Sequence, residues 1–484
     1  MPKKDESQPL LVGGPVDNDL AERGTAPPAA SLGAGPSTSP VLPNESGSLS
    51  TSKSEQSLMD YDPMMNRELD HPTSNCDTLI HLLKGNVGTG ILAMPDAFHN
   101  AGLVLGTVGT LIMGFICTHC MHMLVACAHE LCRRTQVPSL GFSEVCETAF
   151  RTGPVPLQKY HKFVKNLINV FLCITQLGFC CVYFVFVSTN LQEVIGYYLV
   201  HVDIRVYMVL LLLPMIVLNW VKSLKYLTPV SLFASIITVV GLGIIFFYML
   251  QDLPPANTRP AFATWKQLPL FFGTAIYAFE GIGVILPLEN NMQTPQDFGG
   301  CFGVLNTAMV IVATLYTSVG FFGYLKYGED VKVGSITLNL PKADFLAQSV
   351  RLMMALAIFL SYGLQFYVPM RIMWPPIRRR LQTEKAQRIG EYTMRTLLVL
   401  FTFFLASAVP NLGAVISLVG AVSSSTLALI FPPIIELMTF WPTQPGQKLC
   451  PWMVTKDVSI LIFGVLGFGF GTYTSIVNIV HPSL

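Results

Sequence analysis

The chain has 484 residues, of which 51% are hydrophobic and only 12% are charged, and its mean hydropathy is +0.52. Soluble chains carry about 25% charged residues, so this composition excludes an ordinary soluble protein and indicates a membrane protein. The 30 basic and 29 acidic residues nearly balance, which leaves no basic excess for binding nucleic acid. The 11 cysteines lie mostly in apolar stretches and form no paired CxxC pattern, so we expect neither a disulfide scaffold nor a metal site.

Residues 1–72 are rich in Ser, Pro and Gly, as in the stretch TAPPAASLGAGPSTSP. We expect them to form a disordered cytoplasmic tail, because they lack the apolar side chains that would offset the loss of chain entropy. No apolar stretch follows the first basic residues, so a signal peptide is not expected. Glu6, Leu10 and Leu11 match an acidic dileucine sorting signal. Sorting adaptors and nutrient-signalling proteins are therefore the partners expected for this tail.

From residue 73 onward, apolar stretches recur that are long enough to cross a bilayer, which takes about 20 helical residues. We predict an all-α polytopic membrane protein, with a transmembrane domain over 73–484. Its predicted membrane-spanning helices number eleven: 77–99, 102–127, 165–190, 205–221, 227–250, 269–289, 301–323, 346–369, 394–410, 412–437 and 456–480. The ninth and tenth are separated only by Pro410 and Asn411, so the alternative is one fused helix and a total of ten.

Basic residues predict the orientation of these helices. They are concentrated in the loops after the second and eighth predicted helices: Arg133, Arg134, Arg151, Lys159, Lys162 and Lys165, then Arg371, Arg378, Arg379, Arg380, Lys385, Arg388 and Arg395. Cytoplasmic loops carry an excess of Lys and Arg. The N-terminal tail is therefore expected in the cytoplasm and the C-terminus on the opposite side.

Two predicted helices contain glycines at their centres. The first reads KGNVGTG over 84–90 and continues to Pro95, and the sixth reads YAFEGIG over 277–283 and continues to Pro287. Each Gly costs about 1 kcal/mol in a helix relative to Ala, and irregular backbone at membrane depth is tolerated where it lines a cavity or is buried in protein. Interrupted helices at positions one and six indicate a five-plus-five inverted repeat. The predicted repeats cover 73–250 and 268–437, and an extra helix covers 456–480. The alternative is that the glycines only permit close helix packing.

The expected interruptions offer groups that match an amino acid zwitterion. Free N–H groups and the positive end of a half-helix bind a carboxylate, whereas free carbonyl groups at the other end bind an ammonium group. We expect the carboxylate at Gly88, Thr89 and Gly90, and the ammonium near the carbonyls of Ala278, Phe279 and Glu280. The remaining predicted members of the substrate site are Gly85, Asn86, Tyr277 and Gly281, and Tyr362 is a further aromatic candidate for shaping the pocket.

Ionisable side chains in these two helices are the candidates for moving a proton. Asp77, His81 and Lys84 share one helical face, and Glu280 lies in the sixth helix. Charges at membrane depth are costly and therefore indicate function. Imidazole titrates near physiological pH, so His81 is the first candidate, with Glu280 as its partner. The alternatives are an interior histidine with satisfied hydrogen bonds, a lysine that reaches the interface, and a carboxylate that caps the broken helix. No nucleophile with a base and an orienting group is visible, so no enzymatic activity and no cofactor other than the coupled proton are expected.

Four motifs carry a resemblance to a known family: LIHLLKGNVGTGILAMP over 79–95, YFVF from Tyr183, SITLNLP over 335–341 and LQFYVP over 364–369. Together they resemble the proton-coupled amino acid transporters of the amino acid/auxin permease superfamily, over about residues 73–480. The resemblance implies the five-plus-five permease fold, His81 as the proton carrier and residues 88–90 as the carboxylate site. Some members close their outer loops with a disulfide, but the outer loops predicted here contain no cysteine.

The sequence therefore predicts a secondary active transporter that moves small neutral amino acids such as alanine, glycine and proline with protons, by alternating access. The alternative is an amino acid sensor that signals nutrient status with little net flux. A channel is a weaker rival, because no ring of charges for a pore is visible. Expected locations are the plasma membrane, the late endosome or lysosome membrane, or both.

Overall fold

The computed structural model describes residues 62–67, 69, 72–199, 202–221, 224–442 and 449–481. Within these ranges the regular structure is helical, apart from one isolated bridge between Thr73 and Met292. In chain order the helices are α2 (Asn75–Asn86), α3 (Thr89–Ala101), α4 (Leu103–Thr135), α5 (Phe142–Thr152), α6 (Val155–Gln158), α7 (His161–Tyr198), α8 (Ile204–Trp220), α9 (Leu224–Leu250), α10 (Leu268–Ala278), α11 (Ile282–Asn290), α12 (Val304–Tyr327), α13 (Phe345–Arg378), α14 (Glu384–Ala408), α15 (Leu412–Val419), α16 (Phe431–Thr439) and α17 (Pro451–Val480).

Nine helical stretches in the described part of the chain are long and apolar enough to cross a membrane. They include α10 together with α11, and α15 together with α16, which are joined through two π-helical turns at Gly420–Ser424 and Thr426–Ile430. The apolar helix α8 is shorter, at 17 residues, and the first predicted helix is divided between α2 and α3. The prediction of an all-helical polytopic membrane protein is confirmed.

Several predicted boundaries are wrong in detail. The loop predicted after the second helix contains α5 and α6. The loop predicted after the eighth helix is short, because α13 continues to Arg378 and α14 already begins at Glu384. Helices extend past the apolar stretch when polar residues can reach water, so hydropathy alone underestimates their length. Arg371 and Arg388 therefore lie on helices rather than in a loop.

The structure separates the ninth and tenth predicted helices at the expected place. Helix α14 ends at Ala408, and the side chain of Asn411 accepts a hydrogen bond from the backbone N–H of Ala414 at 3.1 Å. An Asn at the N-cap satisfies one of the N–H groups that a helix start leaves unpaired. The alternative of one fused helix is therefore wrong.

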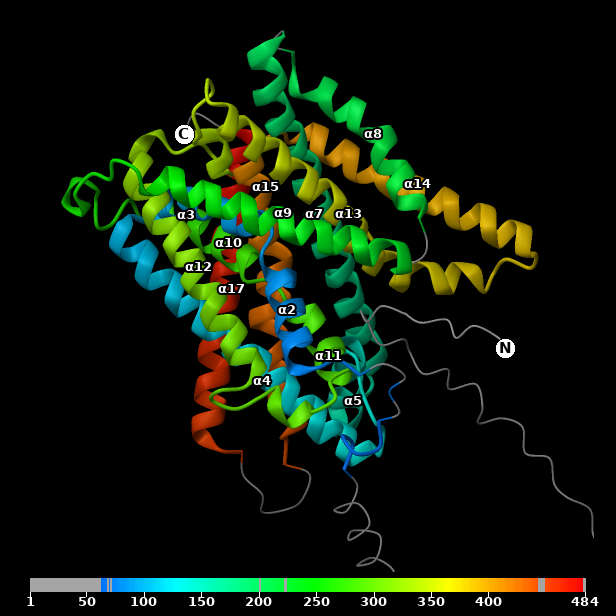
Figure 1. Cartoon of the computed structure of the whole chain (residues 1–484). Helices are drawn as coiled ribbons and strands as arrows, with labels where there is room; N and C mark the ends of the chain where they lie inside the picture. The colour runs from blue at the N-terminus through cyan, green and yellow to red at the C-terminus, as the bar shows by residue number, and fades with distance from the viewer. Residues whose placement is uncertain are drawn as a thin grey trace, which may run out of the picture.

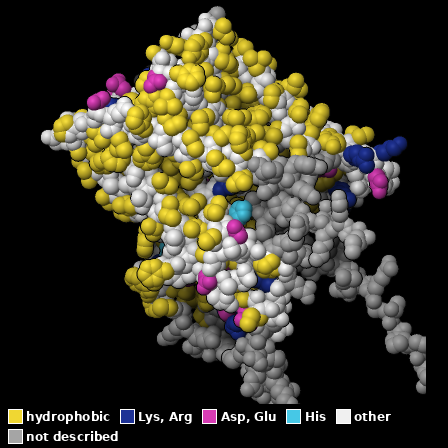
Figure 2. Space-filling model, viewed as in Figure 1, with side chains coloured by type: hydrophobic (Ala, Val, Ile, Leu, Met, Phe, Trp, Pro, Cys, Tyr) yellow, Lys and Arg dark blue, Asp and Glu magenta, His cyan; other side chains and the backbone are white. Residues whose placement is uncertain are grey.

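The helices pack as two groups around the interrupted pair. Helix α13 packs on α7 and α9, and α8 packs on α14, whereas α12 packs on α3 and α4. Figure 1 shows α8, α13 and α14 on one side of the molecule and α4, α10, α12 and α17 on the other, with α2 and α11 between them. Hydrophobic side chains cover much of the upper part of the face shown in Figure 2, and the visible charged side chains lie at its left and right margins and in its central and lower parts. A broad apolar surface of this kind suits contact with lipid.

The segment before α2 contacts the helices, although the sequence predicts residues 1–72 to be a disordered tail. Arg67 donates hydrogen bonds to both carboxylate oxygens of Glu289 on α11, at 3.0 and 3.2 Å, and His129 of α4 lies 2.9 Å from the same carboxylate. The Glu289 side chain is fully buried and that of Arg67 nearly so. The predicted sorting signal at Glu6, Leu10 and Leu11 lies outside the described residues.

Candidate functional site

Both predicted interruptions are present, and the structure defines their extent. Helix α2 ends at Asn86 and α3 begins at Thr89, while α10 ends at Ala278 and α11 begins at Ile282. The N-cap residues of α3 and α11 are Gly88 and Gly281, and neither can supply a side-chain cap. Both second half-helices therefore begin with N–H groups that a ligand can bind, at the positive end of the helix dipole.

Glycines let the two interruptions touch. A Cβ atom placed on Gly90 would lie 2.7 Å from the Cα atom of Ala278, which is closer than side-chain atoms approach a backbone. A Cβ atom on Gly281 would lie 3.1 Å from Oδ1 of Asn86. Gly90 is therefore required for direct contact between the backbone of α3 and that of α10, although 188 residues separate the contacting segments along the chain.

Two hydrogen-bonded links join the interruptions. The hydroxyl groups of Thr89 and Tyr277 lie 2.8 Å apart. The hydroxyl of Tyr316 on α12 lies within hydrogen-bond distance of two backbone oxygens, that of Asn86 at 2.5 Å and that of Ala278 at 2.8 Å. These two oxygens belong to the last residues of α2 and α10, whose carbonyls have no partner within the helix. The ends of both first half-helices are therefore bound to one side chain.

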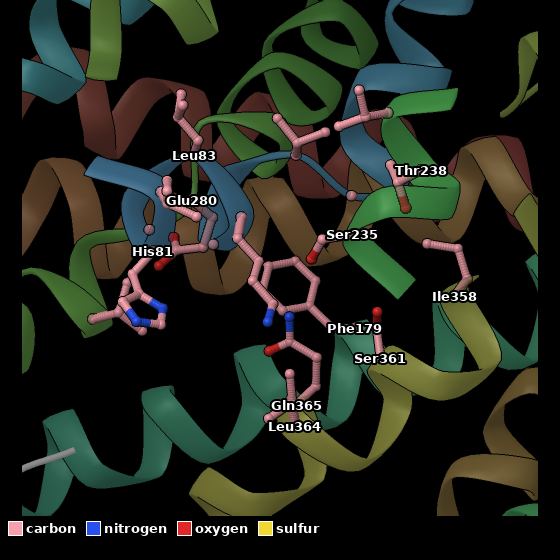
Figure 3. A pocket seen from close by; sticks show the side chains of 18 of the residues that line it. His81, Leu83, Phe179, Ser235, Thr238, Glu280, Ile358, Ser361, Leu364 and Gln365 are labelled. Carbon is pink, nitrogen blue, oxygen red and sulfur yellow. The ribbon is translucent and has the colours of Figure 1, made fainter. Parts of the chain in front are cut away.

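A cavity of about 580 Å³ lies beside the interruptions, and its lining is mainly apolar. The predicted residues that line it lie on α2 or in the two breaks: His81, Lys84, Gly85, Gly88, Glu280 and Gly281. Figure 3 shows His81 and Glu280 at one end of this cavity, with Ser235, Thr238, Ser361 and Gln365 facing it from α9 and α13. The structure therefore brings the two proposed proton carriers and four of the ten predicted substrate-site residues to one cavity.

The other predicted residues lie behind the cavity wall. They are buried and absent from its lining: Asn86, Thr89, Gly90, Tyr277, Ala278 and Phe279. Tyr362 is also buried, and its hydroxyl lies 2.8 Å from that of Thr402 on α14. Other aromatics line the cavity, among them Phe179 of α7, which packs edge-on with Tyr277 at a centroid distance of 4.8 Å. The aromatic candidates from the sequence thus support the wall from behind.

The ionisable candidates have different surroundings. The carboxyl group of Glu280 is buried, and its Oε2 atom accepts no hydrogen bond from any residue in the described ranges. His81 and Lys84 are half-buried on the cavity side of α2. Asp77 does not line the cavity: it forms a capping box with Ser74 at the start of α2, where its Oδ2 atom accepts a hydrogen bond from the Ser74 hydroxyl at 2.7 Å. Among these candidates, Glu280 is thus the buried acid that lines the cavity.

Polar residues on α7 and α13 complete the site and were missed in the sequence. The Nε2 atom of Gln365 donates a hydrogen bond to the Tyr183 hydroxyl at 3.2 Å, and Gln176 places a buried Oε1 atom that has no partner in the described ranges. All three residues line the cavity. The available signal was the presence of uncharged amides within long apolar helices, where polar side chains are expensive.

The described residues contain no group of three or more His, Cys, Asp and Glu side chains arranged to hold a metal ion. All 11 cysteines lie in these ranges, and each is a free thiol. The chemistry available in the cavity is therefore hydrogen bonding, backbone dipoles and the ionisation of His81, Lys84 and Glu280.

Comparison with known proteins finds one family model, two relatives and one solved structure. The family model described as "Transmembrane amino acid transporter protein" matches residues 71–477. The chain is 42% identical over 432 residues to the Drosophila melanogaster protein named "Proton-coupled amino acid transporter-like protein pathetic", a match that covers 89% of this chain and 90% of that protein. It is 27% identical over 413 residues to the Caenorhabditis elegans protein named "Probable amino acid transporter skat-1", covering 83% and 89% of the two chains. Among solved structures, MhsT in complex with L-phenylalanine matches with a TM-score of 0.41 and 13% identity, over 85% of this chain and 100% of that one.

Proposed function

The chain belongs to the transmembrane amino acid transporter family, and from this membership we propose that it is a secondary active transporter of small neutral amino acids coupled to protons. The membership itself makes the chain a multi-pass amino acid transporter and not an enzyme. The proposal adds the substrate class, with alanine, glycine and proline as examples, the coupled proton, and alternating access as the mechanism. The relative from Drosophila melanogaster is named as proton-coupled, which supports the choice of ion.

One observation carries the proposal: two helix N-termini without side-chain caps begin at the same cavity. Helix α3 begins after Gly88 and α11 begins after Gly281, and both glycines line the cavity. The carboxylate of an amino acid would accept hydrogen bonds from N–H groups at the start of α3. Its ammonium group would donate to the carboxyl group of Glu280, which lines the cavity. A backbone site of this kind recognises the part that all amino acids share.

The cavity lining favours neutral side chains. Its volume of about 580 Å³ falls within the range of about 300–1,000 Å³ that is typical of small-molecule sites. Apolar residues such as Phe179 and Leu242 line it together with a few uncharged amides and hydroxyls. A charged substrate side chain would lose its hydration there, and the charged partners that the lining offers are few: His81, Lys84 and Glu280.

The proton role is assigned to His81, with Glu280 as its partner. Both side chains reach the cavity, and Glu280 has an unpaired carboxyl oxygen, so a proton held there removes the cost of a buried negative charge. In this scheme the site is loaded from the acidic side and releases substrate and proton on the neutral side. Each ligand then favours the state that binds it more tightly.

The proposed architecture has eleven spanning helices, with α2/α3 as the first and α10/α11 as the sixth. We place the first inverted repeat at about 73–250, the second at about 268–437, and the additional helix α17 at the end. The N-terminal tail is proposed to be cytoplasmic, and the membrane to be the plasma membrane, the late endosome or lysosome membrane, or both. Adding an epitope to the tail and testing its accessibility in intact cells checks the orientation.

Uptake by the purified protein in proteoliposomes tests the proposed function. Labelled alanine, glycine and proline are supplied at about pH 5.5 and about pH 7.5 outside, a range across which a histidine changes its charge. We expect saturable uptake that is faster from the acidic side. Absence of saturable uptake of any amino acid would refute transport by this chain under these conditions.

The His81→Ala substitution tests the proton assignment separately. Loss of the imidazole should flatten the pH dependence of uptake, while binding of the amino acid to the backbone site is retained. A variant whose pH profile matches that of the unsubstituted protein would refute the role of His81 and leave transport intact.

A second candidate function, amino acid sensing, is favoured by the contact between the N-terminal segment and α11. Arg67 is bound to Glu289 at the far end of the half-helix whose first turn lines the cavity. A ligand-induced shift of α11 would therefore reach the tail directly. Saturable amino acid binding without measurable flux would favour this function over transport.

A further inference from the structure

Tyr316 lies on α12, behind the wall of the cavity. Its side chain is completely buried and it does not line the cavity. Its ring packs against that of Phe279, with centroids 5.0 Å apart, and its hydroxyl reaches the carbonyl oxygens of Asn86 and Ala278. No motif in the sequence marks this residue, because Tyr316 is an ordinary aromatic in an apolar helix.

The hydroxyl of Tyr316 meets an imbalance of donors and acceptors. A phenol has one proton to donate, and it faces two backbone acceptors at 2.5 and 2.8 Å. Both acceptors are the final carbonyls of half-helices, which have no partner within their own helix, and leaving a buried acceptor unpaired is costly. The one proton can serve both carbonyls only while both of them stay within reach of the Tyr316 oxygen atom. The geometry therefore couples the position of the end of α2 to that of α10.

A second hydrogen-bonded link also joins the two interruptions, but it does not hold the end of α2. The hydroxyls of Thr89 and Tyr277 connect the start of α3 to the last turn of α10. Gly90 packs directly on Ala278, so no side chain separates these two segments. The Thr89 link and the backbone contact hold α3 against α10, but neither of them holds the end of α2. Of these three contacts, the one from Tyr316 joins the ends of both first half-helices.

We propose that Tyr316 is a positioning residue for substrate binding: it holds the ends of α2 and α10 in register, so that the cavity-lining backbone at Gly88 and Gly281 is arranged before the amino acid arrives. The inference rests on the proposed transport function. It holds that the hydroxyl group of Tyr316 fixes the relative position of the two breaks. Without that hydroxyl, part of the substrate's binding energy is used to order the two breaks. The loss appears in substrate affinity rather than in the maximal rate.

The Tyr316→Phe substitution removes the hydroxyl and keeps the ring against Phe279. We expect the KM for alanine uptake to rise about three- to tenfold, the effect of one neutral hydrogen bond, with a maximal rate within about twofold of the unsubstituted protein. The matched control is Tyr324→Phe. Tyr324 is also buried on α12, and its hydroxyl lies 3.5 Å from Glu329, away from the interruptions. This control should leave KM within about twofold.

Incorporation of para-aminophenylalanine at position 316 provides a rescue, because its amino group donates hydrogen bonds from the same ring position. We expect its KM to return to within about twofold of that of the unsubstituted protein, and this comparison stands alone if the Phe variant does not fold. A para-aminophenylalanine protein with KM raised as far as the Phe variant would overturn the proposal. So would a Phe variant with unchanged KM, a change in maximal rate alone, or an equal effect of Tyr324→Phe.

The failure of this inference and that of the proposed function give different results. If the unsubstituted protein shows no saturable uptake, transport fails, and the Tyr316 variants are compared by equilibrium binding of labelled alanine with the same expected ratio. If uptake is normal in the unsubstituted protein and in both variants, only the role of Tyr316 fails.

Discussion

The Gly90→Ala substitution would place a methyl group between the two interrupted helices. Its Cβ atom would lie 2.7 Å from the Cα atom of Ala278 and 2.9 Å from its Cβ atom. Carbon atoms rest about 3.5 Å apart, so the closest contact is about 0.8 Å too short. The obstructing atoms cannot rotate away, and α3 must therefore move from α10. Overpacking of this kind costs about 1–3 kcal/mol.

The same displacement would break a link of the site. Moving Thr89 by about 0.8 Å stretches its 2.8 Å contact with the Tyr277 hydroxyl to about 3.6 Å, which is beyond hydrogen-bond range. The N–H groups at the start of α3 move with it, and misplacement by about 1 Å can cost up to a hundredfold in rate where binding geometry is exact. We expect Gly90→Ala to lower amino acid uptake at least about tenfold.

Two assays on the purified protein measure these effects: thermal unfolding in detergent and uptake in proteoliposomes. The matched control is Gly469→Ala on α17, where an added Cβ atom meets nothing within 4 Å. This control should melt at or slightly above the temperature of the unsubstituted protein, because Ala is the better helix former. A Gly90→Ala protein that melts and transports like the Gly469→Ala control would refute the contact between α3 and α10.

Two further predictions concern stability at opposite ends of the molecule. Gly334 has a φ of +86°, and a Cβ atom there would lie 2.6 Å from the backbone nitrogen of Gly413, so Gly334→Ala should destabilise the fold by at least about 2 kcal/mol in thermal unfolding. An unchanged melting temperature would show that this loop is not packed as described. Arg67→Ala should cost about 3 kcal/mol, because it leaves the buried carboxylate of Glu289 without its arginine partner. Lys165→Ala, which breaks a more exposed ion pair, should cost less than about 1 kcal/mol, and equal losses in the two variants would contradict this reasoning.

The interruptions could be predicted from the sequence because their cause is local. A glycine such as Gly88 or Gly281 destabilises a helix in any surroundings. The clusters of glycine around these two residues therefore mark the breaks, even when the packing partners of the helix are unknown. His81 and Glu280 could also be placed at the site, since ionisable side chains at membrane depth are expensive in any fold. The number of apolar stretches likewise follows from composition, although the charged ends of α13 and α14 extended those helices beyond the predicted limits.

The residues that complete the site depend on contacts between distant segments. Gln176 and Gln365 face the cavity only because α7 and α13 pack beside the breaks, and their sequence neighbours do not predict which face of each helix points inward. Tyr316 is a similar case, since its partners Asn86 and Ala278 come from two other helices.

The sequence by itself determined that the chain crosses a membrane, where its helices break, and which charged residues lie beside the breaks. Each of these follows from the free energy of burying a side chain or bending a backbone at one position. The tertiary structure alone decided which sides of the breaks face the cavity and which face one another. Thr89, Gly90, Tyr277 and Ala278 were predicted to meet the substrate, yet they meet each other, because close packing between α3 and α10 leaves no space between them.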